Sequence, residues 1–483
     1  MLFNSLSYAV FLPVVFIVYW VFLKDSFKKQ NIFLLIVSYF FYSFWDWRFL
    51  FLLMFSTFLD FYTGIKIHKS TTDNLKKIWL FISVGVNLGF LSFFKYYNFF
   101  VDSFVDFLSN VGFNVSYSLI NIVLPVGISF YTFHGLSYVF DIYNNKSKPT
   151  NNLINYSLFV SFFPLLVAGP IERSSHLLPQ IEKPRVFDYN KSIDGLRQIL
   201  WGLFKKIVVA DSCAEYANAV FANYNEHSGS TLIVGAICFA FQIYGDFSGY
   251  SDIALGSARL LGFELLQNFS FPYFSRDIPE FWRRWHISLS SWFKDYLYIP
   301  LGGSRGGVWM KIRNTFIIFL VSGFWHGANW TFIIWGGINA LFFLPSLLLG
   351  TNRNNIDIVA KNSKIPSIYE FLQIITTFLI TTLAWIFFRS NTVNDAFGYI
   401  MRILSPSSLK PLDAISTSVS LLHTVVFIII LLLIEWLGRK SKYALENFNY
   451  NFGKVIRWAF YYVIIFLIFY YAHGEEEFIY FQF

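Results

Sequence analysis

Cysteine and charged residues are scarce in this sequence. Only Cys213 and Cys238 occur among 483 residues, which excludes a disulfide framework and gives no support to a metal site or to redox chemistry. Charged residues make up 14% of the chain, too few for a water-soluble protein of this length. A long hydrophilic segment is also missing, so the sequence leaves no room for a separate soluble domain.

Apolar and aromatic residues are abundant instead. They account for 55% and 22% of the chain, with a mean hydropathy of +0.51. This composition predicts an all-α, polytopic membrane protein, because a helix satisfies its own backbone hydrogen bonds in lipid. The N-terminus lacks a basic signal-peptide region, so we expect the first span to be uncleaved. About eleven stretches are long enough to cross a bilayer: 6–23, 31–47, 48–65, 77–94, 119–142, 153–169, 231–255, 313–349, 368–388, 419–437 and 456–472.

We expect a single membrane domain, 1–483, in three parts: N-terminal spans in 1–150, a catalytic core in 151–349 and C-terminal spans in 350–483. The stretch 313–349 is longer than one crossing needs, and its glycine-rich centre predicts a broken helix or hairpin. Irregular backbone at that depth is tolerated only where it lines a protein cavity. An amphipathic stretch lies near 195–210.

The net charge of +8 follows the distribution expected of a membrane protein rather than of a nucleic-acid-binding one. Lys24, Lys28 and Lys29 follow the first stretch, and a second basic loop spans 66–77. Both loops should face the cytoplasm, which places the N-terminus, the Trp45–Arg48 turn and the 95–118 stretch outside. Beyond residue 170 charges of both signs mix, and the alternation of the loops between the two sides becomes ambiguous.

His326 lies inside an apolar run, and an ionisable side chain there usually marks a reaction or transport path. It follows Arg313 by thirteen residues, which places it roughly 20 Å deep, near the middle of the hydrocarbon. Gly323 and Gly327 allow close backbone approach, and Asn329 offers a polar partner. The alternative is a histidine that bonds only a neighbouring helix carbonyl.

The stretch Arg276–Arg313 is the most polar one beside the central apolar runs, with seven basic residues against three acidic ones. This balance favours the cytoplasmic side. Arg283 and Arg284 in this stretch, with the glycine-rich segment 301–307, could hold an anionic donor that carries phosphate. The alternative is an interfacial anchor of Trp and Arg, but His286 in the same stretch favours chemistry.

A further polar cluster ends an apolar span at residues 242–252. It contains Gln242, Asp246, Tyr250 and Asp252 among small residues that permit tight helix packing. The two carboxylates need partners, for which the candidates are basic residues of Arg276–Arg313 or a histidine.

Five ordered motifs resemble the membrane-bound O-acyltransferase family, within it the bacterial branch typified by alginate O-acetyltransferase. They are Gly169-Pro170-Ile171-Glu172-Arg173, then 242–252, then Phe281-Trp282-Arg283-Arg284-Trp285-His286, then Tyr296–Gly303, then Gly323-Phe324-Trp325-His326-Gly327. The likeness extends to residues 384–389 and 478–483. It implies an all-helical fold around a central tunnel, with His326 as the catalytic histidine and His286 as a second catalytic position.

The resemblance also implies transfer of an acetyl group from cytoplasmic acetyl-CoA, with no permanently bound cofactor, to hydroxyls of an extracytoplasmic polysaccharide. A neutral imidazole at His326 would take the proton of the attacking hydroxyl, although an acetyl-histidine intermediate stays open. The donor-binding or tunnel-lining candidates are Arg283, Arg284, Trp285, Tyr250, Asp246, Asp252, Gln242, Asn329 and Trp325.

The acceptor glycan stays open between alginate, another exopolysaccharide and peptidoglycan. The resemblance implies a location in the bacterial inner membrane and a separate extracytoplasmic partner transferase of the SGNH serine-esterase type. The sequence has no long hydrophilic segment for such a domain, so we expect the partner to be another protein. Two alternatives remain: D-alanyl transfer from a carrier-protein thioester to teichoic acid, and a secondary transporter. His134 and His176 are second-tier site candidates.

Overall fold

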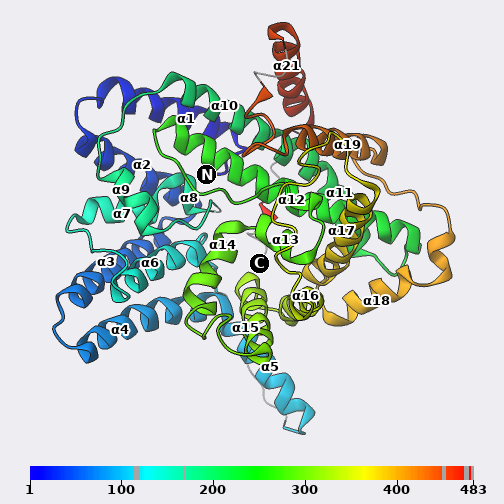
Figure 1. The fold of residues 1–483 in the computed structure, drawn as a ribbon, viewed down its shortest axis with the longest axis horizontal. Coiled ribbons are helices and arrows are strands. Elements are labelled where there is room, and N and C mark those ends of the chain that lie inside the picture. The colour runs from blue at the N-terminus through cyan, green and yellow to red at the C-terminus, as the bar shows by residue number, and fades with distance from the viewer. Residues whose placement is uncertain (114–119, 121, 168, 449–452, 473–477, 480–483) are drawn as a thin grey trace.

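The computed structural model describes residues 1–483 except 114–119, 121, 168, 449–452, 473–477 and 480–483, so most of the terminal motif lies outside the described residues. The described residues form helices and no strands, as Figure 1 shows. The helices are α1 Leu6–Ile17, α2 Phe27–Asp46, α3 Arg48–Lys69, α4 Asp73–Leu91, α5 Tyr97–Asn110, α6 Ile128–Tyr143, α7 Leu153–Ser161, α8 Phe163–Leu166, α9 Ser174–Ile181, α10 Tyr189–Leu203, α11 Asp211–Ala222, α12 Gly229–Leu260, α13 Ile278–Arg284, α14 Ile287–Phe293, α15 Val308–His326, α16 Trp330–Leu348, α17 Ile368–Arg389, α18 Val393–Ile403, α19 Leu421–Gly438 and α21 Lys454–Tyr471. Wider π-helical turns occur at Val18–Phe22, Ser92–Tyr96, Phe204–Ala210 and Lys294–Tyr298.

Seven helical segments within the described residues are long and apolar enough to span a membrane. They are Arg48–Lys69, Asp73–Asn110, Gly229–Leu260, Trp330–Leu348, Ile368–Arg389, Leu421–Gly438 and Lys454–Tyr471. The most apolar part of α12 is 83% buried, against 6% for α21. Helix α12 is therefore the central helix, and α21, which has almost no buried residues, lies at the periphery in Figure 1.

Two of the expected spans are wrong as single helices. In the stretch 119–142, of which 119 and 121 lie outside the described residues, α6 begins only at Ile128, because Gly127 has a left-handed φ of 74° and Pro125 precedes it. The stretch 153–169 is divided into α7 and α8 at Phe162, just before Pro164. Almost all side chains of α6–α8 are buried, so these short helices lie within the protein, and the seven segments fall short of the expected eleven.

The predicted hairpin in 313–349 is confirmed. Helix α15 ends at His326 and α16 begins at Trp330, where the Asn329 side chain accepts the backbone N–H of Thr331 at 3.0 Å. The two helices pack backbone against backbone, since a Cβ at Gly323 would collide with the carbonyl of Phe332, and one at Gly336 with that of Phe319. The glycines thus fix where His326 stands.

This close contact predicts that Gly323→Ala destabilises the protein, because the added methyl forces α15 and α16 apart. The expected effect is about 1–3 kcal/mol, typical of overpacking, seen as a lower melting temperature in detergent. Gly337→Ala is the matched control on α16, since the nearest atom to its Cβ would be an ordinary 3.7 Å away. Equal melting temperatures for the two variants would contradict this packing.

Candidate active site

His326 is the last residue of α15, and its side chain is buried among aromatic rings. The imidazole lies 4.9 Å from the ring of Trp325, 5.2 Å from Trp335 and 5.4 Å from Phe388, measured between centroids. Asn329, the expected polar partner, is occupied elsewhere: it caps α16, and its Nδ2 donates to the carbonyl of Asn391 at 2.9 Å. The setting of His326 is thus apolar and aromatic.

His286 is fixed by a polar network that starts from Asn268. Its Nδ1 lies 2.9 Å from Asn268 Oδ1, which also accepts the Ser288 hydroxyl at 2.9 Å and the Ser288 backbone N–H at 3.4 Å. The backbone donor identifies Oδ1 as the acceptor, so His286 Nδ1 carries the proton. Nε2 has no hydrogen-bond partner among the described residues, which leaves its lone pair for a substrate atom.

The backbone at His286 is itself unusual. His286 has a left-handed φ of 44°, at the point where the chain enters α14. The next backbone N–H, of Ile287, donates to the carbonyl of Asn268 at 2.9 Å, and Ser288 accepts the N–H of Ile171 at 3.0 Å. The Gly-Pro-Ile-Glu-Arg motif thereby supports His286, and such a sparsely populated backbone conformation is typical of functional sites.

Trp325 connects the two histidines. Its ring lies 6.1 Å from that of His286 and 4.9 Å from that of His326. A cavity of about 70 Å³, here called the His326 cavity, is lined by Trp45, Lys95, Leu124–Phe130, Val167, Trp325 and His326. A smaller one of about 20 Å³, the Asn268 cavity, is lined by polar side chains that include Lys205, Ser251, Asp252, Asn268 and Glu435.

The carboxylates of α12 find partners that the sequence did not indicate. Lys205 Nζ lies 2.6 Å from Asp252, and Lys206 Nζ lies 2.9 Å from Asp246. The expected partners, basic residues of Arg276–Arg313 or a histidine, were therefore wrong. The predicted tight packing is confirmed, because a Cβ at Gly249 would lie 2.7 Å from the carbonyl oxygen of Gly202. This contact brings the Phe204–Ala210 turn against α12.

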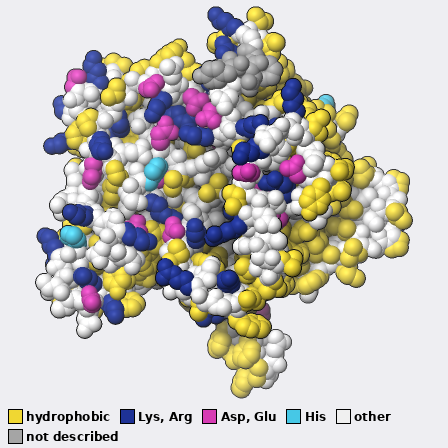
Figure 2. Space-filling view, viewed as in Figure 1, with side chains coloured by type: hydrophobic (Ala, Val, Ile, Leu, Met, Phe, Trp, Pro, Cys, Tyr) yellow, Lys and Arg dark blue, Asp and Glu magenta, His cyan; other side chains and the backbone are white. Residues whose placement is uncertain are grey.

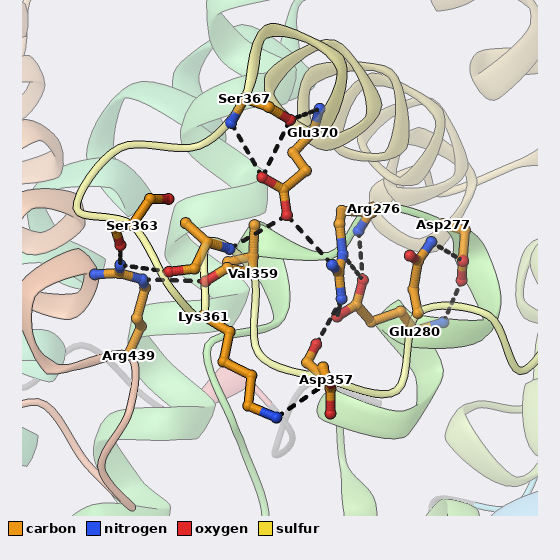
Figure 3. Close-up of polar contacts among 12 residues, drawn as sticks. Arg276, Asp277, Glu280, Asp357, Val359, Lys361, Ser363, Ser367, Glu370 and Arg439 are labelled. Atoms are coloured by element: carbon orange, nitrogen blue, oxygen red, sulfur yellow. Dashed lines mark hydrogen bonds and ion pairs between the residues drawn. The ribbon is translucent and has the colours of Figure 1, made fainter.

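Arginines of the basic stretch hold the protein's own backbone. Arg283 donates to the carbonyls of Asn352 and Asn355 at 2.9 and 2.8 Å. Arg284 forms an ion pair with Glu280 at 2.8 Å, and Glu280 also pairs with Arg276 at 3.0 Å. Figure 3 shows Arg276 bound to Glu280, to Glu370 at the start of α17 and to the backbone carbonyl of Asp357 in the preceding loop. These contacts brace α13 immediately before His286.

The remaining candidates are buried around α12. Tyr250 stacks on Phe3 at 4.3 Å and lies 4.6 Å from Phe478, and the Ile479 backbone N–H donates to Asp246 at 2.7 Å. The hydroxyl of Tyr250 and Oε1 of Gln242 have no hydrogen-bond partner among the described residues. Trp285 packs 5.0 Å from Trp385. These side chains therefore belong to the buried interior of the protein around α12.

The second-tier candidates, His134 and His176, have other roles than His286 and His326. His134 is fully buried within α6 and lies 5.8 Å from the ring of Phe159. His176 Nδ1 lies 2.8 Å from the buried carboxylate of Glu172, which raises the pKa of His176 above its usual value. The Glu172 carboxylate also accepts the N–H of Leu266 at 2.6 Å, so His176 belongs to the support of the Asn268 segment.

Figure 2 shows Lys and Arg side chains spread over the face that carries α13 and α14, with hydrophobic side chains along the edges beside α5 and α18. This basic face includes the stretch for which the charge balance favours the cytoplasm. The described residues contain no group of three or more His, Cys, Asp and Glu that could hold a metal ion.

Comparison with known proteins decides the family. Residues 147–390 match the MBOAT family, membrane-bound O-acyltransferases. The chain is 38% identical to "Probable alginate O-acetylase AlgI" of Pseudomonas aeruginosa over 80% of this chain and 72% of that one. The chain belongs to the membrane-bound O-acyltransferase family. It is therefore a multi-pass membrane acyltransferase, which removes the transporter alternative.

Two further relatives show how far the similarity of this MBOAT chain extends along its length. It is 32% identical to "Peptidoglycan O-acetyltransferase" of Helicobacter pylori, over 100% of this chain and 98% of the relative. It is 28% identical to "Teichoic acid D-alanyltransferase" of Bacillus subtilis, over 46% of this chain and 58% of the relative. The O-acetyltransferase relatives thus cover much more of the chain than the D-alanyltransferase.

Sequence reasoning missed Asn268, the two lysines 205 and 206, and Lys95. Lys205 and Lys206 could have been found as two charges within the amphipathic stretch 195–210, which faces a helix with two carboxylates. Asn268 lies in a loop without a periodic pattern, and Lys95 was taken as the first residue of an outer stretch.

The Asn268 network predicts that Asn268→Ala lowers acyl transfer by up to about 100-fold, because His286 loses the acceptor that sets its tautomer and orientation. Ser251→Ala is the matched control, since it removes only the 3.2 Å contact to Asn268 Nδ2 and keeps the contact to His286. Turnover would be measured in membranes at equal amounts of folded protein. Equal losses in both variants would contradict a role through His286.

Proposed function

We propose that the chain is a transmembrane O-acetyltransferase that moves acetyl groups from cytoplasmic acetyl-CoA toward hydroxyls of an extracytoplasmic polysaccharide. One observation carries the proposal: the rings of His286, Trp325 and His326 lie in succession, His326 lines one cavity, and Asn268, which holds His286, lines another. Thioester and alcohol could then approach the two histidines through separate cavities.

In this mechanism the acceptor hydroxyl attacks the carbonyl carbon of the thioester, and the His326 imidazole takes the hydroxyl proton. The new C–O bond forms as the carbonyl π electrons move to oxygen. Collapse of this tetrahedral intermediate expels the thiolate, which receives the proton from His326. His286 Nε2, with its lone pair directed by the Asn268 contact, orients a donor-side group.

The partner and the place in the cell are part of the proposal. Seven helical segments within the described residues are apolar enough to span a membrane, so we expect the chain to act within the bilayer. We infer that a separate SGNH-type transferase outside the bacterial inner membrane completes the transfer. The relatives named for alginate and for peptidoglycan support a polysaccharide acceptor, with an exopolysaccharide such as alginate first.

The mechanism predicts that His326→Gln lowers acetyl transfer by about 10² to 10⁴-fold, the usual contribution of a general base. The assay follows labelled acetyl-CoA in membranes, normalised to folded protein. His68→Gln is the control, because His68 is exposed at the end of α3 and should be silent. Turnover close to normal in His326→Gln would remove this histidine from catalysis.

The choice of donor is tested separately. Purified protein in liposomes should consume acetyl-CoA in the presence of a hydroxyl acceptor and should not use a D-alanyl carrier protein. The D-alanyl alternative has a specific basis in the teichoic acid D-alanyltransferase relatives. Labelling of product only from the charged carrier protein would select that alternative.

A further inference from the structure

Lys95 holds the turn that carries His326. It lies in the π-helical turn Ser92–Tyr96 between α4 and α5, and its Nζ donates to the carbonyls of Trp325 and His326 at 2.8 and 2.9 Å. The neighbouring Tyr96 hydroxyl donates to the carbonyl of Phe324 at 2.9 Å, and its ring stacks on Phe324 at 4.1 Å. The last three carbonyls of α15, those of Phe324, Trp325 and His326, have no partner within the helix and are bound by Lys95 and Tyr96 of one short segment.

These carbonyls alone do not explain a lysine. Tyr96 shows that a neutral hydroxyl serves such a carbonyl equally well. A charged ammonium in an apolar interior costs free energy unless it is paired, and among the described residues no carboxylate lies within 4.0 Å of Lys95 Nζ. The positive charge therefore calls for a function of its own.

The surroundings of Lys95 show where that charge acts. Lys95 lines the His326 cavity, and every other lining residue apart from His326 is uncharged: Trp45, Leu124, Pro125, Val126, Gly127, Ile128, Ser129, Phe130, Val167 and Trp325. An ammonium has three N–H donors, and two of them go to the carbonyls of Trp325 and His326. The ring of Trp325 lies 5.8 Å from Nζ, and among the described residues no third hydrogen-bond acceptor contacts the ammonium, so its third N–H can donate to a group that enters the cavity.

We propose that Lys95 is a catalytic residue of acyl transfer, which stabilises the negative charge on the acyl oxygen when the acceptor attacks. The inference rests on the proposed function and adds the group that stabilises the oxyanion of the tetrahedral intermediate. As the acceptor oxygen bonds to the acyl carbon and its proton passes to His326, the carbonyl π pair moves to oxygen, and Lys95 donates to this oxyanion. When the intermediate collapses, the pair returns to form C=O, the thiolate leaves and takes up the proton from His326.

The test separates charge from hydrogen bonding. Lys95→Gln keeps N–H donors for the two carbonyls and removes the charge, whereas Lys95→Arg keeps both. We expect kcat in Lys95→Gln to fall about 10² to 10³-fold, the usual cost of losing one oxyanion donor, with KM for the thioester changed by no more than about threefold. Lys95→Arg should recover part of kcat. Tyr96→Phe, which removes only the Phe324 contact, is the matched control and should keep kcat near normal.

Each contrary result would overturn one specific claim. Lys95→Gln with normal kcat, or with a loss no greater than that of Lys95→Arg, overturns the role of the charge. A loss in Tyr96→Phe equal to that in Lys95→Gln assigns Lys95 to the structure of the turn alone and also overturns it. His326→Gln with normal turnover overturns the proposed function itself, whereas an inactive His326→Gln beside a normal Lys95→Gln leaves that function standing and removes only this inference.

Discussion

Polar groups inside an apolar protein must find their partners within the protein, and this constraint determines how the central helices are arranged. Helix α12 carries Asp246 and Asp252 six residues apart, about 9 Å along its axis. Consecutive lysines, 205 and 206, reach both carboxylates from one π-helical turn. Removing either partner would leave a buried charge, which is strongly destabilising. The pairs therefore fix the position of α10 and its following turn against α12.

The same constraint shapes the two histidines differently. The His286 ring is hydrogen-bonded through Nδ1 to Asn268, and the ring of Phe247 lies 4.7 Å from it. His326 stands among the rings of Trp325, Trp335 and Phe388. An imidazole held by the Asn268 amide keeps one tautomer, whereas the imidazole of His326 lies among aromatic rings and lines a cavity that a substrate could enter. One histidine is thereby suited to orientation and the other to proton transfer.

The sequence was sufficient for features that depend on local pattern. The glycine-rich centre of 313–349 predicted the hairpin, because glycine permits the close approach now seen at Gly323 and Gly336. The charge in an apolar run singled out His326. What the sequence could not supply are partners from distant segments: Lys205 for Asp252, Asn268 for His286 and Lys95 for the His326 turn. Periodicity shows which face of a helix is apolar, but not which helix covers it.

Composition alone does not tell which of two uses an arginine serves. Arg283 and Arg284 were expected to bind an anionic donor, and the donors that the structure places go to Asn352, Asn355 and Glu280 of the protein itself. An arginine fork suits a backbone carbonyl as well as a phosphate, so abundance alone does not distinguish the two uses. Two of the expected stretches, 119–142 and 153–169, include the buried helices α6 and α7, which are as apolar as helices with exposed side chains.

The position of His326 at a helix C-terminus creates an electrostatic problem for acyl transfer. The last carbonyls of α15 carry a partial negative charge, roughly half an elementary charge for a full helix, and this opposes any anion formed beside them. A base at that end is favoured when it becomes positive, but the oxyanion that forms in the same step is not. A cation bound to those carbonyls reverses the sign of the local potential without moving the histidine. Lys95, 2.8 and 2.9 Å from the two final carbonyls, places its positive charge where it offsets this repulsion of the oxyanion.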